Sequence, residues 1–102
     1  MSLELKEVIQ NNTFVDKVRI HMHIDELEYE KLCFALRELA KSWRSSTLID
    51  KELSLLLYSM PLMIRNAYLS FGDQGASHNA IAHRLEDIWV ELDELVTECF
   101  SD

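Results

Sequence analysis

Glycine, proline and cysteine are all scarce in this 102-residue sequence, and each shortage limits the fold. With only two glycines and one proline beside 48% hydrophobic residues, the composition is that of a globular protein and not of a disordered one. The two cysteines, Cys33 and Cys99, stand in neither a CxxC nor a Cys/His spacing, which indicates buried thiols and no zinc or redox site. We therefore expect one helical domain over residues 1–102 that folds around a single core without metals or disulfides.

Long apolar runs are also missing. No stretch comes near the roughly 18 uninterrupted apolar residues that a membrane-spanning helix needs. The N-terminal sequence MSLELKEVIQNN has no basic segment followed by an apolar one, as a secretory signal would have. The simplest expectation is a cytoplasmic protein.

The recognisable motifs of catalysis are absent as well: there is no P-loop lysine, no HExxH and no glycine-rich nucleophile elbow. His21 and His23 would share one face of a strand, a spacing that metal sites do use. His78 and His83 are five residues apart and do not share a helix face, so no further ligand is indicated. We interpret the histidines as surface residues and expect no enzyme, no cofactor and no metal.

Three amphipathic patterns predict long helices, at about residues 25–43, 48–71 and 77–100. Asp25 and Ser77 are suited to cap the first and last of these helices, and a Thr47-to-Asp50 arrangement opens the middle one. In the last helix Trp89 flanks the apolar stripe, so we expect it in the core.

The middle helix has two unusual features. Pro61 removes a backbone donor and predicts a kink or a break near Ser59. A second apolar row repeats every seven residues beside the main stripe: Leu48, Leu55, Leu62 and Leu69. Such a helix is buried on two sides, either within one chain or against another.

The N-terminal quarter is ambiguous. Leu5, Val8 and Ile9 suggest a helix, whereas apolar residues alternate from Val18 to Ile24 as in a strand. Residues 1–24 could thus form a β-hairpin, but a two-stranded hairpin alone is marginally stable. We expect an all-α protein, a compact bundle of about four helices, with the hairpin as the alternative.

Basic residues are missing from the C-terminus. After Arg84 the chain has seven acids and no base, whereas residues 1–84 are nearly balanced, and the formal net charge is −8. Nucleic acid and anionic membrane surfaces are therefore unsuitable partners. Four of the acids follow one another at steps of four, three and four on the predicted helix, away from its apolar stripe: Asp87, Glu91, Glu94 and Glu98.

We predict that these four acids form a binding face of a non-enzymatic protein that docks on a basic protein surface. An immunity protein or antitoxin that neutralises a bacterial nuclease toxin is a concrete example, because a nuclease displays a basic phosphate-binding cleft. The competing interpretation is a solvated face that lies partly against the basic segment 31–65. The alternative function is a homodimeric structural or adaptor protein, joined through Leu48, Leu55, Leu62 and Leu69.

Overall fold

The computed structural model describes residues 3–44, 49–72 and 79–101, and every regular element in these ranges is an α-helix. The five helices are α1 (Leu3–Gln10), α2 (Phe14–His21), α3 (Glu26–Trp43), α4 (Lys51–Gly72) and α5 (Asn79–Cys99). None of these helices is both long enough and apolar enough to cross a membrane.

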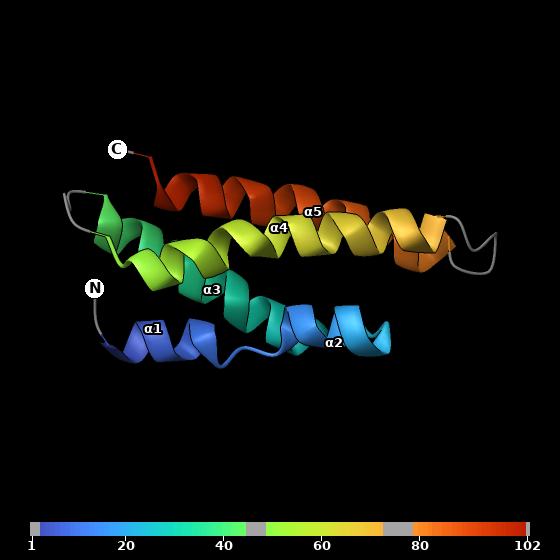
Figure 1. Ribbon diagram of the computed structural model, residues 1–102, viewed down its shortest axis with the longest axis horizontal. Coiled ribbons are helices and arrows are strands. Elements are labelled where there is room, and N and C mark those ends of the chain that lie inside the picture. The colour runs from blue at the N-terminus through green and yellow to red at the C-terminus, as the bar shows by residue number, and fades with distance from the viewer. Residues whose placement is uncertain (1–2, 45–48, 73–78, 102) are drawn as a thin grey trace.

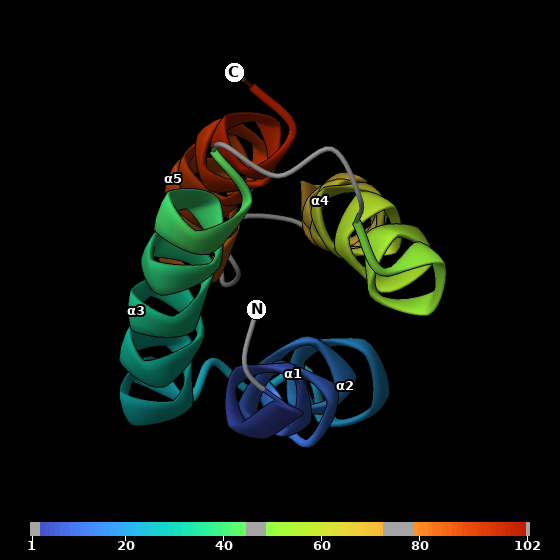
Figure 2. The same cartoon turned by 90° about the vertical axis from the view of Figure 1, so that its left-hand side faces the viewer.

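The helices form an elongated bundle with extents of 46 × 23 × 19 Å. The short helices α1 and α2 lie end to end along one side of it, so that they occupy a single position in the bundle (Figure 1). Viewed along its length, the molecule has four positions, filled by α1 with α2, α3, α4 and α5 (Figure 2). The expected compact bundle of about four helices is confirmed in this sense.

The β-hairpin alternative for residues 1–24 is wrong, because both segments are helical. In α2 the buried residues are Phe14, Val15 and Val18, which share one helix face. Ile20 is 62% exposed, although strand alternation would have placed it on the same face as Val18. The packing of Phe14 against Tyr29 of α3, with ring centroids 4.9 Å apart, is what fixes the helix face.

Two aspartate side chains cap the N-termini of helices. Asp25 accepts a hydrogen bond from the Glu28 amide, which confirms the predicted cap of α3. At α4 the capping residue is Asp50, whose carboxylate accepts from the Leu53 amide at 2.9 Å. Thr47 and Ser77 lie outside the described residues.

The same two aspartates hold the N-terminal helices in place. Lys6 Nζ lies 2.7 Å from Asp50, and Lys17 Nζ lies 2.7 Å from Asp25. Each lysine, through its hydrogen bond, lowers the pKa of its aspartate. Helices α1 and α2 are therefore attached at the first turns of α4 and α3.

Helix α4 continues through Pro61 without a break. The Ser59 hydroxyl donates to the Leu56 carbonyl at 2.7 Å, next to the turn whose hydrogen bond the proline removes. The core side of the helix carries Leu53, Leu57, Met60 and Ile64. Burial of this stripe against the neighbouring helices keeps the helix continuous despite the missing donor.

Candidate protein-binding surfaces

The acidic strip, defined as Asp87, Glu91, Glu94 and Glu98, lies on the exposed part of α5. The opposite side of α5 carries the fully buried Leu85, Ile88 and Leu92, so the predicted division of the helix into an apolar and an acidic side is confirmed. Between Asn79 and Cys99 the helix has six acids and one base. The strip is thus part of a strongly anionic surface.

Glu91 has a structural contact that the sequence does not reveal. The Tyr29 hydroxyl of α3 donates a short hydrogen bond to its carboxylate, and the Cys33 thiol lies 3.7 Å from the same oxygen. Burial, followed by this hydrogen bond, raises the pKa of Tyr29 well above its usual range. Glu91 therefore joins α5 to α3 and is the one member of the strip with a fixed partner among the described residues.

Asp87, Glu94 and Glu98 form no ion pair within the described ranges. The lysines of the neighbouring helix pair within that helix instead, Lys31 with Glu28 at 3.4 Å and Lys41 with Glu38 at 3.7 Å. These three carboxylates are accordingly available to a cation from outside the described chain.

A polar cleft of about 230 Å³ lies beside the strip, between α3 and α5. Arg84 forms two hydrogen bonds to Glu26, at 2.8 and 2.6 Å, and its guanidinium lies over the Tyr29 ring. Arg37 also lines the cleft, together with Glu91. Through Arg37 this cleft brings α5 against part of the basic middle segment, as the interpretation of a solvated face expects, and among the four strip residues only Glu91 lines it.

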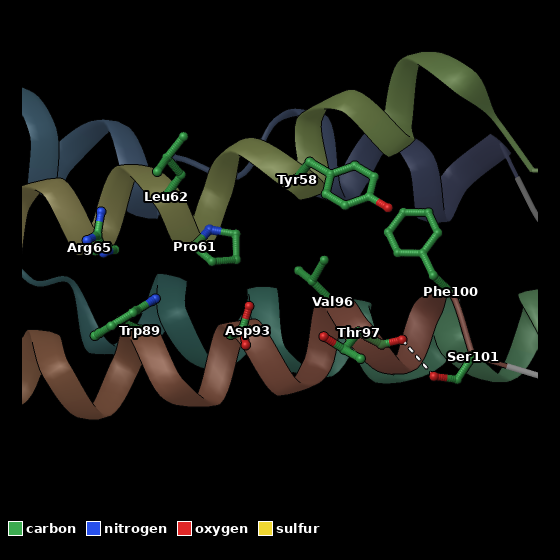
Figure 3. A pocket seen from close by; sticks show the side chains of 10 residues that line it. All are labelled: Tyr58, Pro61, Leu62, Arg65, Trp89, Asp93, Val96, Thr97, Phe100 and Ser101. Atoms are coloured by element: carbon green, nitrogen blue, oxygen red, sulfur yellow. Dashed lines mark hydrogen bonds between the residues drawn. The ribbon is translucent and has the colours of Figure 1, made fainter.

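A second hollow lies between α4 and α5 and has a volume of about 420 Å³ (Figure 3). Its walls are mostly apolar: Tyr58, Pro61 and Leu62 from α4, with Trp89, Val96 and Phe100 on the side of α5. The rings of Tyr58 and Phe100 stack at a centroid distance of 4.9 Å and close one end. We call this hollow the α4–α5 groove.

The groove also holds one base and one acid. The Arg65 guanidinium lies over the Trp89 ring, 5.9 Å from its centroid, and Asp93 lies between Trp89 and Val96 on the opposite wall (Figure 3). Trp89 is partly buried, packs against the hydrophobic core and stacks on Tyr68. It therefore lies at the edge of the core, and the prediction that it belongs to the core holds only in part. Its indole faces the neighbouring helix at the surface of the bundle.

The predicted leucine row on α4 is exposed. Leu55, Leu62 and Leu69 have 70%, 54% and 49% of their surface accessible, and Leu48 lies outside the described residues. The main stripe of α4 is buried within the chain, whereas this second row is not. The described part of the chain therefore does not cover both apolar sides of the helix.

The histidines do not form a site in the described ranges. His21 lies in the last turn of α2, His23 follows that helix, and both are exposed, so they are not neighbours on a strand. No group of three or more His, Cys, Asp or Glu side chains in these ranges is arranged to hold a metal ion.

We expect the protein to lose stability in alkali because of Cys99. Burial raises the pKa of this thiol from 9.0 to about 11, so between these pH values the unfolded chain ionises while the folded chain keeps its proton. The free energy of unfolding should fall across this window, by at most about 1.4 kcal/mol per pH unit from this group. This fall in the free energy of unfolding is measured by urea unfolding of the wild type and of Cys99→Ala at pH 8, 9, 10 and 11. Equal slopes for the two proteins would contradict the assignment to Cys99.

Sequence reasoning missed the α4–α5 groove, because its walls come from two helices whose pairing no local pattern specifies. A signal for one wall exists: Trp89, Asp93, Val96 and Phe100 are spaced by four, three and four residues.

No protein-family model, no curated protein and no solved structure matches this chain.

Proposed function

We propose that this protein is a non-enzymatic binding module whose acidic strip on α5 docks on a basic surface of another protein. The observation that carries the proposal is the exposure of Asp87, Glu94 and Glu98 without an ion pair in the described ranges. Exposed charges of one sign attract an oppositely charged partner and repel wrong ones, which raises the association rate.

The position of the strip supports a binding role over a stabilising one. Glu98 lies in the last turn of α5, where the helix dipole favours cations, and Glu94 lies about one turn before it. An acid in the last turn costs about 0.3 to 1 kcal/mol at low salt. A cationic partner would offset this cost, and the basic cleft of a nuclease toxin is one surface with the required charge.

The proposal predicts that neutralising the strip abolishes capture of the partner while the fold stays intact. The variant Asp87→Asn, Glu94→Gln, Glu98→Gln removes three charges and leaves the contact of Glu91 with Tyr29 in place. We expect equal or slightly higher thermal stability, because acids spaced three or four apart on a helix repel one another. Affinity capture from native lysate of the source cell, followed by mass spectrometry, measures the loss of partner binding. The association rate of the partner is then measured for the variant and for the wild type.

A matched control removes the same number of charges elsewhere, with Glu4→Gln, Glu7→Gln and Asp16→Asn on the exposed sides of α1 and α2. This control should retain the partner. Association with the wild type should slow steeply as salt is added, since exposed charges are screened beyond about 8 to 10 Å near physiological ionic strength. If the strip variant and the control lose the partner equally, net charge and not the strip is responsible, and the proposal fails.

A further inference from the structure

We infer that the exposed face of α4 pairs with the same face of a second copy of this chain. Leu55, Leu62 and Leu69 are exposed and are spaced by seven residues, so the row is symmetric about Leu62. A two-fold axis at Leu62 that pairs the two α4 helices antiparallel would set Leu55 against the partner's Leu69. Such a self-complementary surface is what a two-fold dimer requires.

The charge distribution favours α4 as the dimer interface. A net charge of −8 opposes self-association in general. From Lys51 to Ser70, however, α4 has two bases and one acid, whereas α5 has six acids and one base. Two copies that meet through α4 therefore bring together their least anionic long helix.

The α4–α5 groove supplies reciprocal charges. Arg65 and Asp93 both line it, and neither forms an ion pair within the described residues. In an antiparallel pairing about a two-fold axis, α5 lies on the same side of α4 in both copies, so groove faces groove. Arg65 of each copy then lies opposite the partner's Asp93, and the two pairs neutralise each other near the axis.

The same geometry argues against a basic helix of another protein as the occupant. Such a helix would find apolar walls in Tyr58 and Phe100, but Arg65 would repel its cations. A second copy satisfies both Arg65 and Asp93. This interface lies on a different side of α5 from the acidic strip, because Asp93 faces α4 while Glu91 contacts α3. It goes beyond the proposed function, and its test is independent of any basic partner.

The test is a charge exchange followed by analytical ultracentrifugation. We expect wild-type protein to sediment as a dimer of the 11.9 kDa chain at tens of micromolar. Arg65→Glu alone and Asp93→Arg alone each place like charges together, and each should raise the dimer dissociation constant at least about tenfold. An equimolar mixture of the two variants should form a heterodimer, because both cross-copy pairs are again of opposite sign.

Leu62→Lys and Leu27→Lys form a matched pair of apolar-to-basic changes. Leu62 lies at the proposed axis, whereas Leu27 is 72% exposed on α3. Only Leu62→Lys should give a monomer, and circular dichroism should show that every variant is folded. A monomeric wild type at 100 micromolar, a mixture that stays monomeric, or equal effects of the two leucine changes would each overturn the dimer.

Discussion

Replacing Phe14 by Ala is expected to destabilise the protein by about 3 to 5 kcal/mol, as truncation of a buried aromatic does. Phe14 is fully buried in α2 and packs on Tyr29, so its loss removes the ring contact between α2 and α3. Thermal or urea unfolding followed by circular dichroism measures the effect. This is the largest change that we expect from a single substitution in the N-terminal quarter.

Ile20→Ala is the control, and it also decides between helix and strand for this segment. Ile20 is 62% exposed, so its truncation should change the stability by less than about 0.5 kcal/mol. Strand alternation would bury Ile20 together with Val18 and predicts a large loss. A destabilisation by Ile20→Ala comparable to that of Phe14→Ala would contradict the helical α2.

Leu92→Ala should cost about 2 to 5 kcal/mol, because Leu92 is fully buried in the middle of α5 and its removal leaves a cavity. The neighbouring Val90 is 49% exposed on the outer side of the same helix. Val90→Ala should be neutral or slightly stabilising, since alanine has the higher helix propensity. Unfolding curves of both variants establish which side of α5 faces the core and hence that the acidic strip faces solvent.

The three long helices could be predicted from the sequence because each carries an apolar stripe with a period close to 3.6 residues. The predicted ranges 48–71 and 77–100 compare with Lys51–Gly72 for α4 and Asn79–Cys99 for α5. The stripe alone separates the buried Leu92 from the exposed Glu94. Where one face of a long helix is buried, local periodicity is sufficient to predict both the helix and its buried side.

The N-terminal quarter could not be decided, because α1 and α2 have only eight residues each. An apolar residue at every second position argues for a strand, yet in the helix Val18 is buried while Ile20 and Met22 are exposed. The contact of Phe14 with Tyr29, which settles the question, joins residues of different helices. Met22, with a φ angle of 53°, ends α2 in the left-handed region, and nothing in its residue type announces this.

The candidate site, too, can be predicted from the sequence only in part. Exposure of the strip follows from the helical wheel, but the bond of Glu91 to Tyr29 depends on how α3 lies beside α5. A tryptophan beside an apolar stripe is normally buried, and on that pattern alone Trp89 belongs to the core. Its partial burial at the edge of the core follows from the pairing of α4 with α5, where Arg65 and Tyr68 pack against the indole.

Helices α3 and α5 run in the same direction, since Glu26 meets Arg84 near one end and Leu36 meets Cys99 near the other. The contacting residues are 58 and 63 positions apart in the chain, with α4 between them. Closing so long a loop is entropically costly, whereas α4 and α5 can fold back on each other as sequence neighbours. We therefore expect the α4–α5 hairpin to form before α3 docks on α5, so that Glu91 gains its Tyr29 contact and the surface around the acidic strip is completed late in folding.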